Sequence, residues 1–267
     1  ATNISEFQNA RDKFSALGDY EDSFELVKKC QAEIDRFREE ERKETERLAR
    51  RVKIINIIVW SIIAFSIISV VVAKKIVIPN YRNSEMYYKK CEIGDTLYMG
   101  KIDGQRIEWT VLDVDGNRLL VVANDAVAMM PYNTDKVDCT WETCSLRNWL
   151  NNDFYNEAFS VVEQSRILTT TVSAENNPNY STDAGNTTED RIFLLSIDEV
   201  NQYFRTDSSR VCEYNGDVCW WWLRSPAHSL QDHAAFVSSG GSVIFGGDSV
   251  DASRDAVRPA LWINLES

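Results

Sequence analysis

The longest apolar run in the chain covers residues 54–73, which are twenty consecutive positions without a charged side chain. Twenty residues of α-helix rise about 30 Å, which matches the hydrocarbon core of a bilayer. A buried core helix can produce a similar run. A signal peptide fits less well, because the run is long and follows a charged segment. We predict one transmembrane helix at residues 54–73.

Residues 1–30 show helical spacing of apolar positions. Phe7, Ala10, Phe14 and Leu17 recur at that spacing and Gly18 ends the run. The segment FSALGDYEDSFELVKKC resembles a tetratricopeptide-like helical-hairpin repeat. One such unit cannot bury its own apolar face, so earlier residues or a partner must complete it. A cytosolic protein partner for this segment is one of the two ways to complete the unit.

Residues 31–53 are dominated by charge and hold neither Gly nor Pro. Glu39 with Lys43 and Glu46 with Arg50 form i,i+4 pairs, so we predict a solvated juxtamembrane helix. Basic residues flank the apolar run on both sides, and the densest cluster is Arg50-Arg51-Val52-Lys53. This cluster favours a cytoplasmic N-terminus and an extracellular C-terminal domain.

We predict a polar linker at residues 74–91. After it, the sequence predicts many short strands. Residues 107–114 alternate, Asp115-Gly116-Asn117 turns, and residues 118–123 return as the second arm of a hairpin. Ser145 is expected to cap one helix, and Ser196 with Glu199 forms a capping box for another. Residues 174–190 are expected to form a polar surface loop. Strands mixed with two short helices predict an α+β domain at residues 92–267.

Charge and cysteine content narrow the classes of function. Residues 80–267 contain 15 Lys and Arg against 28 Asp and Glu, so a nucleic-acid partner is not expected. Six cysteines are present without a C-x-x-C pair, and His228 and His233 are the two histidines. We therefore predict no metal and no cofactor. Cys139 with Cys144 and Cys212 with Cys219 are local disulfide candidates in an oxidising space, and buried free thiols are the alternative.

Two stretches carry a family resemblance. TWETCSLRNWLNNDFYNEAF and CWWWLRSP…AAFVSSGGSV…AVRPALWINL resemble a bacterial cell-surface domain family of uncharacterised function. That family is similar to the C-type-lectin fold in the version shared with formylglycine-generating enzymes and with the variable proteins of diversity-generating retroelements. The resemblance covers roughly residues 92–265 and implies a bacterial single-pass surface protein with a C-type-lectin-like ectodomain.

Proteins with this fold belong to two functional classes, enzymes and binding proteins, and the resemblance is compatible with either. Formylglycine-generating enzymes need two active-site cysteines near the C-terminus, and the last cysteine here is Cys219. The sugar-binding signatures Glu-Pro-Asn, Gln-Pro-Asp and Trp-Asn-Asp are absent from the sequence, so calcium-dependent lectin activity is not expected either. We therefore predict no catalytic residues. An enzyme of the formylglycine-generating type stays the alternative, and a signalling or scaffolding role of the cytosolic helical segment is another.

The binding hypothesis places a protein or glycan ligand on the segment between Pro226 and Arg258. Chemically mixed side chains lie there among Gly240, Gly241, Gly246 and Gly247, which permit turns. Phe236, Phe245 and Arg254 are the expected anchors. Ordinary hairpin faces without a ligand would produce the same pattern. The predicted ligand-binding residues are His228, Ser229, Gln231, Asp232, His233, Phe236, Ile244, Phe245, Asp248, Asp251, Ser253, Arg254 and Asp255.

Other residues are expected to form the frame. Consecutive strand residues point to opposite faces, so Trp221 should differ in exposure from Trp220 and Trp222. Arg224 and Arg258 are expected to make fixed polar contacts inside the domain. Two pairs of neighbouring carboxylates, Asp113 with Asp115 and Glu189 with Asp190, are expected to be solvated at turns.

Overall fold

The computed structural model describes residues 2–18, 20, 22–228 and 230–266. The chain forms two compact units that meet in sequence between Val72 and Ala73. The first unit is helical. The second combines helices with two main β-sheets, so the chain is α+β with one long apolar N-terminal helix, as predicted at this level.

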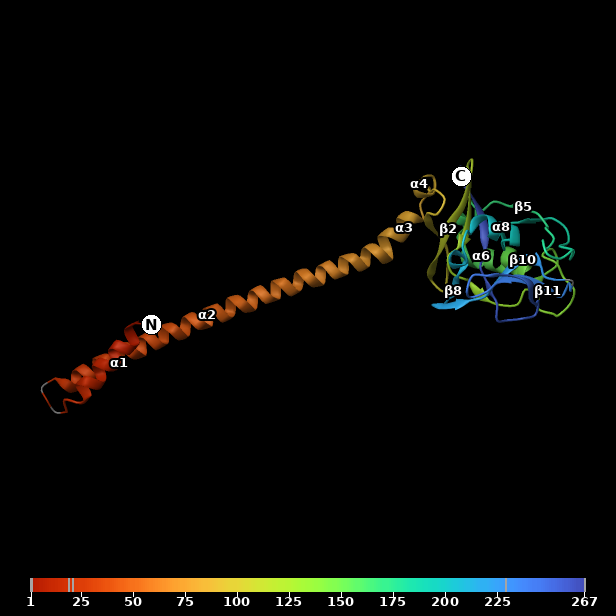
Figure 1. Cartoon of the computed structure of the whole chain (residues 1–267). Coiled ribbons are helices and arrows are strands. Elements are labelled where there is room, and N and C mark those ends of the chain that lie inside the picture. Colours follow the sequence, from red (N-terminus) through yellow and green to blue (C-terminus); the bar gives the residue numbers. More distant parts are fainter. Residues whose placement is uncertain (1, 19, 21, 229, 267) are drawn as a thin grey trace. The chain divides into compact units, whose positions relative to one another are not determined.

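The first unit consists of α1 (Thr2–Ser15) and α2 (Ser23–Val72), and Figure 1 shows α1 alongside the first part of α2. The ring centroids of Phe7 and Phe37 lie 6.0 Å apart, and Ile34 is fully buried between the helices. Phe24 stays 80% exposed. The two helices thus bury only part of their apolar surface.

The charged segment and the apolar run are parts of the same continuous helix α2. Its apolar residues are exposed, with Trp60 at 70% and Phe65 at 72%. The hydroxyl groups of Ser61, Ser66 and Ser69 donate to the carbonyl four residues earlier, at 2.8–2.9 Å. The helix is long and apolar enough to cross a membrane, and none of the residues in its most apolar part is buried. That exposure is not expected of the core helix of a soluble domain, and the internal serine bonds suit an environment without water.

Residues 74–91, expected as a linker, are folded onto the second unit. They form a π-helical turn (Ala73–Val77), α3 (Ile78–Arg82) and α4 (Glu85–Tyr88). Tyr88 is buried, and its hydroxyl donates to the carbonyl of Tyr98 at 2.7 Å. The hydroxyl of Tyr87 donates to the carbonyl of Thr96 at 3.0 Å. The polar composition of this segment predicted a linker, but two of its tyrosines attach it to β1.

The first sheet has the order β1-β2-β3-β14-β7 and is antiparallel throughout. The predicted hairpin is confirmed, because β2 and β3 pair around Asp115-Gly116-Asn117. Leu119 to Ala123 are buried, and β14 adds the C-terminal strand between β3 and β7. The strands are β1 (Thr96–Ile102), β2 (Gln105–Asp115), β3 (Arg118–Ala123), β14 (Ala260–Asn264) and β7 (Ile192–Phe193).

The second sheet has the order β12-β11-β10-β13-β4. Its central strand β10 pairs antiparallel with β11 and parallel with β13, so the Trp-rich segment lies in the middle of the sheet. The strands are β12 (Val243–Ser249), β11 (His233–Val237), β10 (Trp221–Pro226), β13 (Ala256–Val257) and β4 (Ala128–Met129).

Short helices and hairpins surround the two sheets. Cys144 caps the first of these helices, with Ser145 as its first residue, and the predicted capping box of Ser196 and Glu199 is confirmed. The helices are α5 (Ser145–Trp149), a π-helical segment (Leu150–Phe154), α6 (Tyr155–Ala158), α7 (Val161–Gln164), α8 (Ile197–Tyr203) and α9 (Asp207–Arg210). The small hairpins pair β5 (Thr170–Val172) with β6 (Thr188–Asp190) and β8 (Cys212–Tyr214) with β9 (Asp217–Cys219).

Arg224 and Arg258 form the polar part of the frame, as predicted. Arg224 is buried and binds both carboxylate oxygens of Glu199, with a further bond to the carbonyl of Leu194 at 3.0 Å. Arg258 donates to the carbonyl of Ala123 at 2.8 Å. Its guanidinium carbon lies 5.0 Å from the centroid of the Trp221 ring. Buried arginines held by several hydrogen bonds fix the position of the strands around them.

The expectation that Asp190 is solvated was wrong. Its carboxylate is buried and accepts from Arg147 Nε at 2.6 Å, from Trp141 Nε1 at 2.9 Å and from Thr188 Oγ1 at 2.6 Å. Glu189 beside it is exposed, as expected for one of two neighbours in strand β6. The local sequence does not reveal Arg147, because that partner lies 43 residues earlier.

Candidate functional site

The three consecutive tryptophans, residues 220–222, differ in role: two are buried in the domain and the first lines a surface pocket. Trp221 lies on one face of the second sheet and packs against Phe204, whereas Trp220 and Trp222 both contact Phe236 on the other face. The alternation of faces is therefore as predicted. The predicted difference in exposure is wrong for Trp222, which is as completely buried as Trp221, because Tyr132 covers it.

Trp220 is half-buried and lines a pocket of about 370 Å³. Its indole stacks on the buried ring of Phe236, with centroids 5.0 Å apart and planes 15° apart. The guanidinium carbon of Arg254 lies 5.1 Å from the indole centroid. The pocket is lined by Met129, Tyr214, Asp217, Val218, Cys219, Trp220, Ser239 and Arg254.

Arg254 is held at the pocket by a carboxylate from the edge strand β12. Its Nε donates to Asp248 Oδ2 at 2.8 Å, while the arginine side chain remains 64% exposed. An exposed guanidinium beside an indole can bind a carboxylate or a carbonyl oxygen of a ligand. The pocket therefore combines an aromatic floor with a positioned cation at the rim.

Asp255 is the most unusual charged residue of this region. It is fully buried, and neither of its carboxylate oxygens accepts a hydrogen bond from any residue that the structure describes. Burial and the neighbouring carboxylate of Asp248 raise the pKa of Asp255 to about 7. The protonated carboxyl can donate to Asp248, so a proton satisfies one of the two orphaned oxygens near neutral pH.

The two histidines form a second cluster on the same segment. The ring centroids of His228 and His233 lie 5.2 Å apart, and the ring of Tyr180 lies 6.2 Å from that of His228. The side chains of His233 and Asp232 are joined by a hydrogen bond of 2.7 Å between Nδ1 and Oδ1, which lowers the pKa of Asp232. The structure therefore brings the polar residues that follow β10 together, separately from the Trp220 pocket.

The polar loop before Thr188 is anchored rather than freely projecting. Asn177 is buried, and its amide nitrogen donates to the carbonyls of Pro226 and Phe245 at 3.0 and 2.9 Å. Gln231 donates to the carbonyl of Asp183 at 3.0 Å. The loop therefore covers part of β12, which is the edge strand of its sheet.

The structure divides the predicted ligand-binding residues into four groups. Phe236 and Asp255 are buried, so they support the face from below. Arg254 lines the Trp220 pocket and is bound by Asp248, and Ile244 lies opposite Phe236 in the β11–β12 ladder. His228, Gln231, Asp232 and His233 belong to the histidine side of the segment, and the carbonyl of Phe245 is bound by Asn177. Asp251 and Ser253 are exposed in the turn before β13, and Ser229 lies outside the described residues.

Sequence reasoning missed most of the pocket lining. Tyr214, Asp217, Val218 and Cys219 come from the β8–β9 hairpin, and Met129 comes from β4. The Asn215-Gly216 pair is a signal for that hairpin that our prediction did not use, because Asn-Gly is typical of two-residue hairpin turns; both residues adopt a positive φ. What the sequence does not reveal is that this hairpin lies beside Trp220.

Two of the four glycines expected in turns lie inside a strand. Gly246 and Gly247 belong to β12, and the ladder with β11 shifts its register between Ala234 and Phe236. A Cβ at Gly247 would lie 2.2 Å from Ala227 Cβ, and its φ is +70°. Gly247 is therefore required by close packing, whereas a Cβ at Gly246 would have its nearest neighbour at 3.9 Å.

All six cysteines are buried free thiols. Cys212 and Cys219 are opposite residues in the β8–β9 ladder, and the Cys219 thiol donates to the Cys212 carbonyl at 3.4 Å. The interaction between the two neighbouring thiols lowers the pKa of Cys212, and it raises the pKa of Cys219. Burial raises the pKa of Cys144 to about 12.

These observations define an α+β domain with an aromatic-floored surface pocket. Residues 116–265 match the family model described as "Domain of unknown function (DUF6273)". Because the match covers more than half of the 267 residues, the chain belongs to this family. No curated protein and no solved structure matches the chain.

Proposed function

We propose that the chain is a single-pass bacterial surface protein whose sheet-rich unit recognises a protein or glycan ligand. In this proposal α2 crosses the membrane, its N-terminal part is cytoplasmic and the sheet-rich unit is extracellular. The unit adopts a C-type-lectin-like fold and performs no chemistry. The aromatic pocket at Trp220 is the single observation that carries the recognition hypothesis.

The composition of the pocket supports recognition. Indole, phenol and thioether groups supply apolar contact, and Asp217, Ser239 and Arg254 supply polar groups around them. Aromatic and arginine side chains surrounded by polar groups are typical of protein and glycan binding sites. Sugars and peptides both present apolar faces next to polar groups, so the pocket suits either class.

The pocket has a rigid support and an adjustable rim. Phe236 is buried beneath the Trp220 indole and Trp222 is buried against Phe236, whereas Arg254 is largely solvent-exposed. Rigid aromatic anchors lower the entropy cost of binding, and an exposed arginine adapts to its partner. A retroelement-diversified surface would use the same division, with variable residues on a fixed frame. Sequencing the surrounding locus tests that link, because the absence of a reverse transcriptase and a template repeat would exclude it.

The recognition hypothesis is tested with the full chain purified in detergent. The protein is applied to a glycan array and is used to capture proteins from bacterial and host surface extracts. We expect saturable binding at micromolar concentration or below in one of the two experiments. Binding to neither would contradict the proposal.

A further inference from the structure

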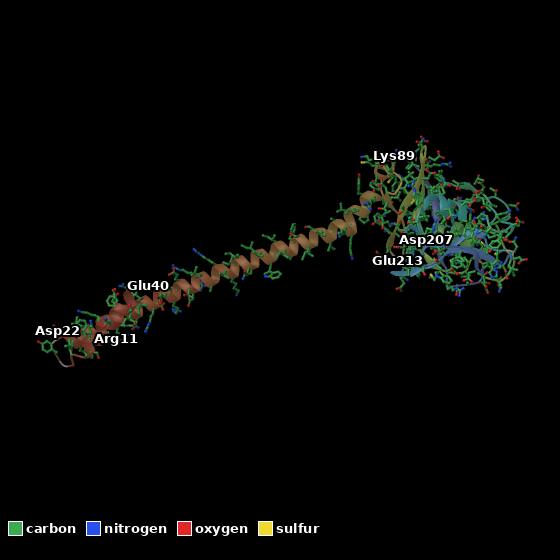
Figure 2. The ribbon with its side chains drawn as sticks, in the orientation of Figure 1. Arg11, Asp22, Glu40, Lys89, Asp207 and Glu213 are labelled. Atoms are coloured by element: carbon green, nitrogen blue, oxygen red, sulfur yellow. The ribbon has the colours of Figure 1, made fainter. Side chains whose placement is uncertain are left out.

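The first segment of the sheet-rich unit is positively charged, whereas the rest of that unit is negatively charged. Residues 74–106 contain seven Lys and Arg against four Asp and Glu, whereas residues 107–267 contain ten against twenty-four. Lys74, Lys75, Lys90 and Lys101 are exposed and form no ion pair with any residue in the described ranges. Lys89, which directly follows α4 and is labelled in Figure 2, pairs with Glu85 at 2.6 Å. The segment thus presents an excess of unpaired positive charge.

Two of these cations face each other across the β1–β2 hairpin. Lys101 and Arg106 are direct partners in the antiparallel ladder. Like charges in that position repel each other and destabilise the hairpin. Neither side chain has a carboxylate partner among the described residues. An anion bound between the two would remove the repulsion.

The two cations line a pocket of about 340 Å³ together with Asn83, Glu163 and Arg166. Arg106 Nη2 donates to Asn80 Oδ1 at 2.8 Å, and Nη1 lies 2.6 Å from the amide oxygen of Asn83 when that amide faces it. Both acceptors are neutral amides. They position the guanidinium and leave its charge uncompensated.

The carboxylate of Glu163 lies in the same pocket, but it forms no ion pair with Lys101 or Arg106 among the described residues. It accepts from the backbone N–H of Gly100 at 3.0 Å and from the backbone N–H and the hydroxyl of Ser160 at 2.9 and 2.7 Å. Burial acts to raise the pKa of Glu163, but these hydrogen bonds outweigh it and the pKa is lowered. Arg166 is paired with Glu85 at 3.1 Å. Lys101 and Arg106 are therefore the two cations of this pocket without an ion-pair partner, and their two positive charges exceed the one negative charge of Glu163.

Only a few residues of chain separate Asn80, which binds Arg106, from the end of the apolar run. Asn80 follows Ala73 by seven residues, which span about 25 Å at most when extended. The neighbouring helices α3 and α4 expose Tyr81 at 50% and Met86 at 63%. Tyrosine next to lysine and arginine is typical of the headgroup layer of a membrane.

We propose that Lys101 and Arg106 bind the phosphate of an anionic lipid headgroup, and that the exposed side of α3 and α4 lies in the headgroup layer. This inference rests on the membrane anchoring in the proposed function and is independent of the ligand of the Trp220 pocket. Free phosphate has the same chemistry as the headgroup. Proximity along the chain favours the lipid, because a bilayer would surround the preceding helix.

The test is a titration of the full chain in detergent with short-chain phosphatidylglycerol or phosphatidylcholine, followed by native mass spectrometry. We expect tighter binding of phosphatidylglycerol, and a loss of about fivefold in affinity for Lys101→Gln and for Arg106→Gln. The loss should shrink in 0.5 M salt because surface charges are screened. Arg205→Gln removes an exposed arginine elsewhere and should leave the affinity unchanged.

Three results would overturn the inference. Equal binding of both lipids would exclude a headgroup site. A Lys101→Gln variant that binds like the unchanged protein would exclude this pocket, and it is informative because Lys101 forms no ion pair that the fold needs. Inorganic phosphate that binds as tightly as phosphatidylglycerol and displaces it would show a free-anion site instead. Alkaline extraction of membranes tests the anchoring separately, since the titration does not depend on it.

Discussion

The buried carboxyl group of Asp255 lies against that of Asp248, and no described residue donates a hydrogen bond to Asp255. Asp248 is held in turn by Arg254, the residue that covers the indole of Trp220. The protonation state of a buried carboxyl is therefore connected to the rim of the proposed binding pocket through two side chains. This connection gives the region a predictable dependence on pH.

Asp255 should make the protein less stable as the pH rises from about 4 to about 7. Its pKa in the folded state is about 7, against 3.8 for the ordinary carboxyl, so the folded state favours the protonated form. The favourable contribution is complete below pH 4 and is lost as the pH rises to about 7, which amounts to roughly 4 kcal/mol. Asp255→Asn should abolish this dependence and unfold at a higher temperature than the unchanged protein at pH 8.

Thermal unfolding of both proteins at pH 5 and pH 8 measures the effect. Asp251→Asn is the matched control, because Asp251 is exposed in the same turn. A variant Asp255→Asn that is less stable than the unchanged protein at pH 8 would contradict the explanation.

Substitution by alanine should be much more destabilising at Gly247 than at Gly246. At Gly247 the new Cβ would lie 2.5 Å from the carbonyl oxygen of Ala234, and the positive φ adds strain. We expect Gly247→Ala to lower the free energy of unfolding by about 2 kcal/mol or more. Gly246→Ala meets no close neighbour and should change it by less than about 1 kcal/mol. Denaturant titration of both variants decides, and equal effects would refute the packing argument.

Glu199 should be essential for stability because it neutralises buried Arg224. Glu199→Ala leaves the guanidinium without its carboxylate and also removes the capping box with Ser196, so a loss of about 3 kcal/mol or more is expected. Asp198→Ala changes an exposed carboxylate in the same first turn of α8 and should cost under about 1 kcal/mol. Chemical denaturation compares the two, and similar losses would show that the ion pair is not important.

Cys212 and Cys219 should be the first pair to form a disulfide under oxidation. Opposite residues of an antiparallel ladder have Cα atoms about 4.5–5.5 Å apart, which is within the range of a disulfide. The lowered pKa of Cys212 favours its thiolate, whereas the pKa of Cys144 is raised to about 12. Peptide mapping after mild oxidation should find a Cys212–Cys219 link. A Cys139–Cys144 link in its place would count against this register.

The sequence predicted features that depend on neighbouring residues. The β2–β3 hairpin follows from alternation around Gly116, and the start of α8 follows from Ser196 and Glu199 three positions apart. The length of the apolar run at residues 54–73 likewise needs no partner to be recognised.

Features that depend on distant partners could not be predicted in this way. The burial of Trp222 requires Tyr132, which lies 90 positions earlier, and that of Asp190 requires Arg147. The Trp220 pocket needs the β8–β9 hairpin and Met129 as well as the predicted Arg254. Alternating polarity indicates which residues share a face of a strand. It does not indicate which other element covers that face.

The recognition hypothesis is tested most directly by one substitution at the rim of the pocket. Arg254→Ala leaves the buried layer of Phe236 and Trp222 in place and removes the exposed guanidinium above Trp220. The measurement is the affinity of the full chain for the glycan or surface protein that it captures. We predict a loss of tenfold or more for Arg254→Ala and no change for Arg205→Ala. Unchanged affinity of the Arg254→Ala variant would contradict the assignment of the binding site to this pocket.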